Sequence, residues 1–203
     1  MNLKVNNLKL TFYGGVGSTT GANIMLEFSN RKILVDCGLL QGARFAEEKN
    51  FESFKYNPAS VDYLLITHAH MDHIGKVPKL VRDGFKGKII STKATFELAG
   101  PMLADALKVM RVKHPNQIIF EESDVAKALS LWEGKNYEGK IELFENCFLE
   151  MQDAGHVLGS AICNVTCGTG DSMRKITFTG DLGNSPSPLL PDTEFPKDVD
   201  YLV

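Results

Sequence analysis

The stretch Asp62–Leu80, DYLLITHAHMDHIGKVPKL, constrains the fold more than any other part of the chain. Its apolar run YLLI has the length of a strand, and a helical pattern follows a few residues later. Between the two lie three of the five histidines of the chain and one aspartate, namely His68, His70, Asp72 and His73. A tight turn at the end of a strand can aim such side chains at one small volume. We therefore predict that four ligating groups converge there.

Short β-rich runs and helical patterns alternate along the chain, and no internal repeat is present. This alternation predicts an α/β or α+β domain. Strands are expected near residues 8–13, 23–29, 31–36, 62–67, 87–91, 140–144, 147–153, 160–167, 174–180 and 199–203. Helices are expected near residues 74–84, 94–112 and 122–132. Hairpin signals such as EFSNRKILVDCG indicate sheets that are partly antiparallel.

The composition is that of an ordinary globular domain. Of the 203 residues, 43% are hydrophobic and 23% are charged. No apolar run approaches the roughly 18 residues that a membrane span requires, so we expect no membrane association. The N-terminal residues lack the features of a secretory signal, and we therefore expect a cytoplasmic location. The net charge of −3 does not by itself indicate that the chain binds nucleic acid.

The four cysteines do not indicate a disulfide framework, because none of them forms a C-x-x-C pair. Cys163 and Cys167 fall in one expected strand, where they would lie about 13 Å apart. That separation is too large for a disulfide bond. We expect all four cysteines to be reduced packing residues.

Imidazole and carboxylate groups together are ligands for borderline divalent ions, zinc above all, with manganese, iron or cobalt as alternatives. Two further candidates, His156 in DAGHVLGS and Asp181 in TGDLGN, also follow expected strands. Taken alone, each is more simply explained as a turn residue. Together with the histidine cluster, they predict ligands that converge at one sheet edge. An incidental histidine-rich surface loop is the alternative.

Three other features lie near these candidates. Asp36 ends the expected strand KILVD, and we interpret it as a carboxylate that orients a ligand histidine or its loop, with an ordinary Asp-x-Gly turn as the alternative. The loop YGGVGSTTGAN matches no nucleotide-binding pattern and is interpreted as a flexible wall beside the metals. A basic run is interpreted as a solvated helix face, with phosphate contact as the alternative; it comprises Lys76, Lys79, Arg82, Lys86 and Lys88.

These motifs resemble a known family. HAHMDH is similar to the H-x-H-x-D-H signature of the metallo-β-lactamase fold, with His156 and Asp181 at the next two ligand motifs. GGVGSTTGANIMLE, DAGHVLGSA, GDLG and DYLV resemble more narrowly the β-CASP branch, whose members are mostly RNA-processing nucleases. The resemblance implies an α/β fold, the αββα sandwich, with metals at one edge of its two sheets.

The resemblance also implies roles for the candidate residues. The ligands would be His68, His70 and His156 for one zinc ion, Asp72 and His73 for a second, and Asp181 as a bridge. Asp72 and Asp181 would be the catalytic carboxylates, and manganese is an alternative to zinc. Two ions about 3.5–4 Å apart activate a water as hydroxide for in-line attack on a phosphodiester. RNA is therefore the expected substrate, and DNA is left open.

The pattern departs from the family near its end. Relatives continue into an acidic motif, an inserted β-CASP domain and two further histidine motifs, none of which occurs before Val203. We expect residues 1–203 to be the N-terminal portion of a metallo-β-lactamase domain, with an incomplete sandwich and no nuclease activity of its own. A thioester hydrolase or lactonase, and a non-catalytic subunit of an RNA-processing assembly, are the alternatives. The mode of cleavage and the oligomeric state are left open.

Overall fold

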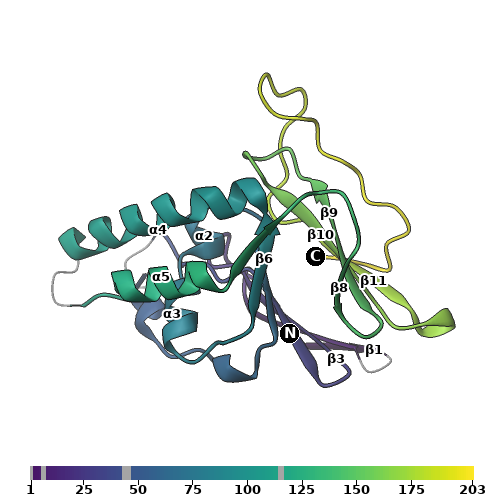
Figure 1. Cartoon of the computed structure of the whole chain (residues 1–203), viewed down its shortest axis with the longest axis horizontal. Helices are drawn as coiled ribbons and strands as arrows, with labels where there is room; N and C mark the ends of the chain where they lie inside the picture. Colours follow the sequence, from purple (N-terminus) through teal and green to yellow (C-terminus); the bar gives the residue numbers. More distant parts are fainter. Residues whose placement is uncertain (1, 6–7, 43–46, 114–116) are drawn as a thin grey trace.

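The computed structural model describes residues 2–5, 8–42, 47–113 and 117–203, and it shows an α/β architecture in three layers (Figure 1). Two β-sheets pack against each other, and the helices lie against the outer face of the first sheet. The predicted α/β class is confirmed.

The first sheet has seven strands and is mixed. In spatial order the strands are β1 (Asn2–Val5), β2 (Leu8–Gly14), β3 (Asn23–Phe28), β4 (Arg31–Val35), β5 (Tyr63–Leu65), β6 (Lys88–Thr92) and β7 (Trp132–Lys135). Neighbours from β1 to β4 are antiparallel, and those from β4 to β7 are parallel. Because β4 and β5 run in the same direction, the residues that follow them, Asp36 and His68, leave the sheet at the same edge.

The second sheet has five strands. In spatial order they are β12 (Tyr201–Leu202), β11 (Arg174–Phe178), β10 (Ala161–Cys167), β9 (Cys147–Asp153) and β8 (Ile141–Phe144). Both β9 and β11 are antiparallel to β10, so they run in the same direction as each other. The loops that follow them, with His156 and Asp181, therefore leave from one edge.

Four α-helices are described, and they form one layer (Figure 1). They are α2 (Met71–Ile74), α3 (Val77–Arg82), α4 (Lys93–Lys113) and α5 (Glu122–Ser130), with short 3₁₀ helices η1 (Lys49–Phe51), η2 (Pro58–Ser60) and η3 (Gly170–Ser172). Pro78 occupies the first turn of α3, where the amide donors lack intrahelical partners. No helix in the described ranges is long and apolar enough to cross a membrane.

Two hydrophobic cores explain why the run YLLI is apolar throughout. Leu64 packs into the core between the helices and the first sheet, whereas Leu65 packs into the core between the two sheets. Successive strand side chains point to opposite faces, so a strand buried on both faces needs apolar residues at every position. The strand that precedes the histidine cluster is thus buried on both faces in the interior of the first sheet.

The structure corrects several boundaries. β1 and β7 were not predicted, and the helix expected at 122–132 ends at Ser130 because Trp132 begins β7, where its indole Nε1 donates to Ser91 Oγ at 2.8 Å. The helix expected at 74–84 is divided into α2 and α3. Within the described residues, no helix covers the outer face of the second sheet, so the fourth layer of the expected sandwich is not found there.

Candidate metal centre

Six predicted ligand side chains meet at the sheet edge. His68, His70, Asp72 and His73 come from the segment after β5, His156 from the loop after β9, and Asp181 from the loop after β11. The side chain of His68 is 0% exposed, whereas that of Asp181 is 45% exposed. The cluster is therefore anchored in the interior and opens to solvent at Asp181.

The first cluster consists of His68, His70, His156 and Asp181, each with one ligand atom within 4.8 Å of the others. His70 Nδ1 lies 3.0 Å from His68 Nε2 and 3.3 Å from His156 Nε2. Ligands about 2.0–2.1 Å from a tetrahedral zinc ion are roughly 3.3 Å from one another. The spacing of the three imidazoles therefore fits one such ion.

The second cluster consists of Asp72, His73 and Asp181. His73 Nε2 lies 3.4 Å from Asp181 Oδ1 and 3.8 Å from Asp72 Oδ2. The other oxygen of Asp181, Oδ2, lies 3.6 Å from His156 Nε2 and 3.8 Å from His68 Nε2 in the first cluster. One carboxylate thus presents one oxygen to each cluster, which is the geometry that a bridging ligand requires.

Asp36 and Thr67 set the orientation of two histidines. Asp36 Oδ2 lies 2.7 Å from His73 Nδ1 and accepts the Thr67 hydroxyl at 2.8 Å, while Asp36 Oδ1 accepts the Thr67 amide at 2.9 Å. Because the Thr67 hydroxyl donates to Asp36, it accepts from His68 Nδ1, which lies 3.1 Å away. Both imidazoles are therefore turned so that Nε2 faces the cluster, with a proton held on Nδ1. The contact between Asp36 and His73 is the one expected of an orienting carboxylate.

Thr67 was not singled out from the sequence, although it directly precedes His68. It is 1% exposed, and both its amide and its hydroxyl are used by Asp36. A hydroxyl residue between the apolar run YLLI and His68 was the signal that the sequence offered for it.

Burial and neighbouring charges set the protonation of the histidines. Burial, followed by the effect of His73, lowers the pKa of His68 to about 2, and burial also lowers the pKa of His156. Burial disfavours the charged form of His73 as well, but the Asp36 carboxylate outweighs it and raises the pKa of His73 to about 9. Neutral His68 can accept a cation directly, whereas His73 must first release a proton.

The loop that carries His156 is held by hydroxyl side chains that sequence reasoning missed. Ser160 Oγ accepts the backbone amide of His156 at 3.1 Å. The carbonyl of Gly159 accepts the hydroxyls of Thr92 at 2.6 Å and Thr95 at 2.8 Å, at the junction of β6 and α4. These contacts fix the backbone of a loop whose imidazole has to meet residues far away in the sequence.

Two glycines allow the ligand loops to approach each other closely. A Cβ atom on Gly38 would lie 1.5 Å from the carbonyl oxygen of Asp72, and one on Gly183 would lie 1.8 Å from that of Gly155. The adjoining backbone contacts include Cys37 N to His73 O at 2.7 Å. The motifs DCG and GDLG are therefore explained by backbone packing against the ligand loops.

The glycine-rich loop lies beside the cluster, as predicted. Gly15 and Ser18 line a cavity of about 210 Å³ together with His73 and Asp181.

The interpretation of the basic run as a solvated helix face is wrong for Lys79, which is 3% exposed and pairs with Asp83 at 2.5 Å.

The family model of the metallo-β-lactamase superfamily matches residues 20–201, a range that includes all six ligand candidates. The chain belongs to the metallo-β-lactamase superfamily. This confirms the family inferred from HAHMDH, with His156 and Asp181 at the next two ligand motifs. As a member of this superfamily, the chain carries a His/Asp cluster of the kind at which its hydrolases bind metal.

Relatives of this superfamily member include proteins named for action on RNA. The chain is 36% identical over 196 residues to Ribonuclease TTHA0252 of Thermus thermophilus, and the match covers 97% of the chain and 43% of the relative. It is 30% identical to cleavage and polyadenylation specificity factor subunit 3 of Dictyostelium discoideum, and the match covers 93% of the chain and 24% of the relative. It is 26% identical to transcription termination factor FttA of Methanocaldococcus jannaschii, and the match covers 94% of the chain and 30% of the relative. The chain spans less than half the length of these relatives.

Solved structures of the superfamily share the fold. The crystal structure of BJP-1, a subclass B3 metallo-β-lactamase of Bradyrhizobium japonicum, matches with a TM-score of 0.52 and 16% identity, covering 89% of this chain and 62% of that one. A B3 metallo-β-lactamase with an active-site glutamic acid matches with a TM-score of 0.53 and 16% identity, covering 90% and 65%. At this identity the likeness concerns the fold alone.

Proposed function

We propose that this chain is the N-terminal, metal-binding portion of a β-CASP ribonuclease, and that the longer protein hydrolyses RNA phosphodiester bonds in the cytoplasm. The β-CASP insert and the completion of the metallo-β-lactamase domain would lie in the remainder of that protein. The observation that carries the proposal is the carboxylate of Asp181, which presents one oxygen to each of two His/Asp clusters. The names of the ribonuclease and the polyadenylation factor among the relatives support RNA as the substrate.

The residues present fit a site for two zinc or manganese ions. Those that would hold them are His68, His70 and His156 for one ion, Asp72 and His73 for the other, and Asp181 between the two. When bound, such ions would lower the pKa of a water molecule and stabilise the charge that develops on the phosphate. Asp72 and Asp181 are the catalytic carboxylates in this proposal.

The remaining groups prepare this site rather than react. Asp36 holds the proton of His73 on Nδ1, and the Thr67 hydroxyl does the same for His68. The cavity beside Asp181 is also lined by Phe12 and Phe178. A reacting phosphate would thus meet ligand atoms that are already oriented.

Two other functions use the same fold. A thioester hydrolase or lactonase would share the metal residues, and a non-catalytic subunit would need the clusters only as structure. All six ligand side chains are present and converge, which favours catalysis over a purely structural role.

Cleavage assays of the longer protein test the proposal. Single-stranded RNA, DNA of the same sequence, a thioester and a lactone are each incubated with zinc or manganese. We expect RNA cleavage that is lost when His68 and His70 are both replaced by alanine, and far slower cleavage by the 203-residue chain alone. Hydrolysis of the thioester or the lactone without RNA cleavage would contradict the proposal.

A further inference from the structure

A second cavity, of about 210 Å³, lies beside the glycine-rich loop. Residues lining it include Gly15, Ser18, Asn23, Lys49, Lys55 and Lys76. Gly15 and Ser18 also line the cavity that contains His73 and Asp181. The loop is therefore a wall shared by the two cavities, and the second cavity adjoins the metal centre.

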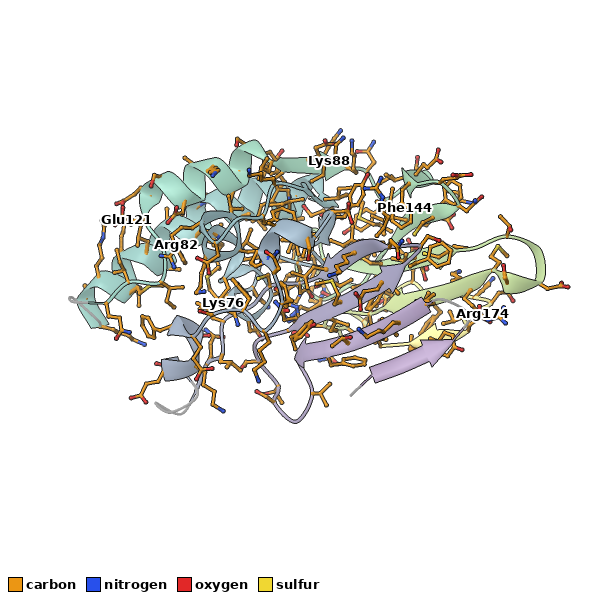
Figure 2. All side chains as sticks on the ribbon, turned by 90° about the horizontal axis from the view of Figure 1, so that it is seen from below. Lys76, Arg82, Lys88, Glu121, Phe144 and Arg174 are labelled. Carbon is orange, nitrogen blue, oxygen red and sulfur yellow. The ribbon has the colours of Figure 1, made fainter. Side chains whose placement is uncertain are left out.

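The second cavity carries an excess of positive charge. Lys49, Lys55 and Lys76 line it, whereas Glu52 is the single carboxylate among its described lining residues. Lys49 and Lys55 are exposed, and Lys76 is half-buried. Figure 2 shows Lys76 between the helical layer and the N-terminal strands of the first sheet.

None of these three lysines is held in a salt bridge within the part of the chain that the structure describes, in contrast to Lys79, which pairs with Asp83. Lys76 feels the charge of Glu52 without forming an ion pair with it. Lys76 Nζ instead lies 5.9 Å from the ring centre of Phe54. Such a contact leaves the hydrogen-bond donors of the ammonium group available.

Asn23 gives a second and independent indication of a ligand. It is 2% exposed, it lines the cavity, and neither atom of its side-chain amide makes a hydrogen bond of good geometry with a described residue. The Tyr56 hydroxyl, close to Asn23 and Cys37, is also buried without a hydrogen bond of good geometry. Buried polar groups normally have partners, and the loose contact between Asn23 and Tyr56 leaves their donors and acceptors open to a ligand in the cavity that both residues line.

The groups around this cavity are those that bind a phosphate. An ammonium group and an amide N–H both donate to phosphate oxygens, and charge-assisted hydrogen bonds of this kind are the strong ones. Gly15, which lines the cavity, has a φ of 76°, a turn conformation that can present backbone N–H groups to anions. An apolar or cationic ligand would leave these donors unused.

We propose that the second cavity binds a backbone phosphate of the RNA strand, at least one nucleotide away from the phosphate that lies at the metal centre. The proposal rests on the proposed function, because a strand that reaches the metals must carry its neighbouring phosphates across the adjoining surface. The shared wall of Gly15 and Ser18 lies between the two positions. The cavity would hold the strand in register without taking part in the reaction.

The test measures binding without cleavage, in metal-free protein. A fluorescein-labelled single-stranded RNA is titrated with the chain, with a Lys55→Gln/Lys76→Gln variant, and with a Lys108→Gln/Lys127→Gln control. Lys108 and Lys127 are exposed residues of α4 and α5, so the control removes the same charge elsewhere. Lys55→Glu is a further variant at an exposed position, where folding is not at risk.

We expect the cavity variant to bind RNA at least about fivefold more weakly, and the control to change affinity less than about twofold. The slope of log affinity against log salt should fall by about 0.7 for each phosphate that the variant no longer neutralises. Lys55→Glu should weaken binding as well. Equal effects of the cavity and control variants, or no binding of RNA by the chain, would overturn the inference.

A second arm uses inorganic phosphate and NMR. We expect the side-chain amide resonance of Asn23 to shift with millimolar phosphate, and to stop shifting in the Lys55→Gln/Lys76→Gln variant. A cavity that holds only water would leave this resonance unmoved and would refute the proposal. Phosphate and RNA binding without cleavage by the longer protein would instead refute the proposed nuclease function and leave the phosphate site standing.

Discussion

Replacing Asp36 by asparagine should weaken the second metal cluster more than the first, which feels the change only through Thr67 and its contact with His68. The asparagine oxygen can still accept the Thr67 amide in place of Asp36 Oδ1, but its NH₂ group then takes the position of Oδ2, which lies 2.7 Å from His73 Nδ1. Two donors cannot face each other at that distance, so the proton of His73 has to move to Nε2. That atom, 3.4 Å from Asp181 Oδ1, is the one that would bind the metal.

The magnitude follows from the hydrogen bond that the substitution removes. Metal binding through Nε2 would return the proton to Nδ1, where it would face the asparagine NH₂ instead of a carboxylate. A hydrogen bond to a charged group contributes about 1.5–3 kcal/mol, and loss of such an orienting partner typically costs about 10–100-fold in metal affinity. We expect a loss in that range for the Asp72–His73–Asp181 cluster.

The assay is competition between the metal-free protein and a chromophoric zinc chelator, fitted with two sites. Asp62→Asn is the matched control. The Asp62 carboxylate accepts hydrogen bonds from the Arg31 guanidinium and the Lys32 backbone amide, and it is not one of the metal-cluster residues. We expect two unchanged affinities in the control. Two unchanged affinities in Asp36→Asn, or an equal loss at both sites, would refute the role given to this carboxylate.

Three further predictions concern the same centre. Replacing His68 and His70 together by alanine should abolish tight zinc binding, and unchanged stoichiometry and affinity would contradict the ligand assignment. Asp181→Ala should weaken both zinc sites and lower hydrolysis by the longer protein by orders of magnitude, while the circular dichroism spectrum stays unchanged; near-normal activity with two bound metals would rule out bridging. The raised pKa of His73, about 9 against 6.5 for a free histidine, means that its pairing with Asp36 stabilises the metal-free chain fully below pH 6.5 and is lost as the pH rises through 9. The free energy of unfolding should therefore fall by up to about 3 kcal/mol over this window, and the fall should disappear in Asp36→Asn.

The ligand residues could be predicted from the sequence because each follows a strand at the same edge. The pattern YLLIT-HAHMDH places a strand, a turn and a helix in order, and His156 and Asp181 repeat the placement after two other strands. The direction of neighbouring strands then brings these ends together. Local pattern and strand direction agree here, so little further information was needed.

Other parts of the structure depend on contacts that no local pattern carries. The segment WEGK has no clear alternation, and it becomes β7 because it pairs with β6 and its tryptophan reaches Ser91 across the sheet. The position of Thr67 between Asp36 and His68 depends on β4 lying beside β5. The division of the two Asp181 oxygens between the clusters likewise depends on three segments far apart in the sequence.

The central claim is that the two His/Asp clusters hold two transition-metal ions that share Asp181. Crystals of the zinc-loaded protein, measured above and below the zinc absorption edge, test it most directly. The account predicts an anomalous peak among His68, His70 and His156, and a second, weaker peak beside His73, with Asp181 between the two. No peak among these side chains, or zinc bound elsewhere on the chain, would contradict it.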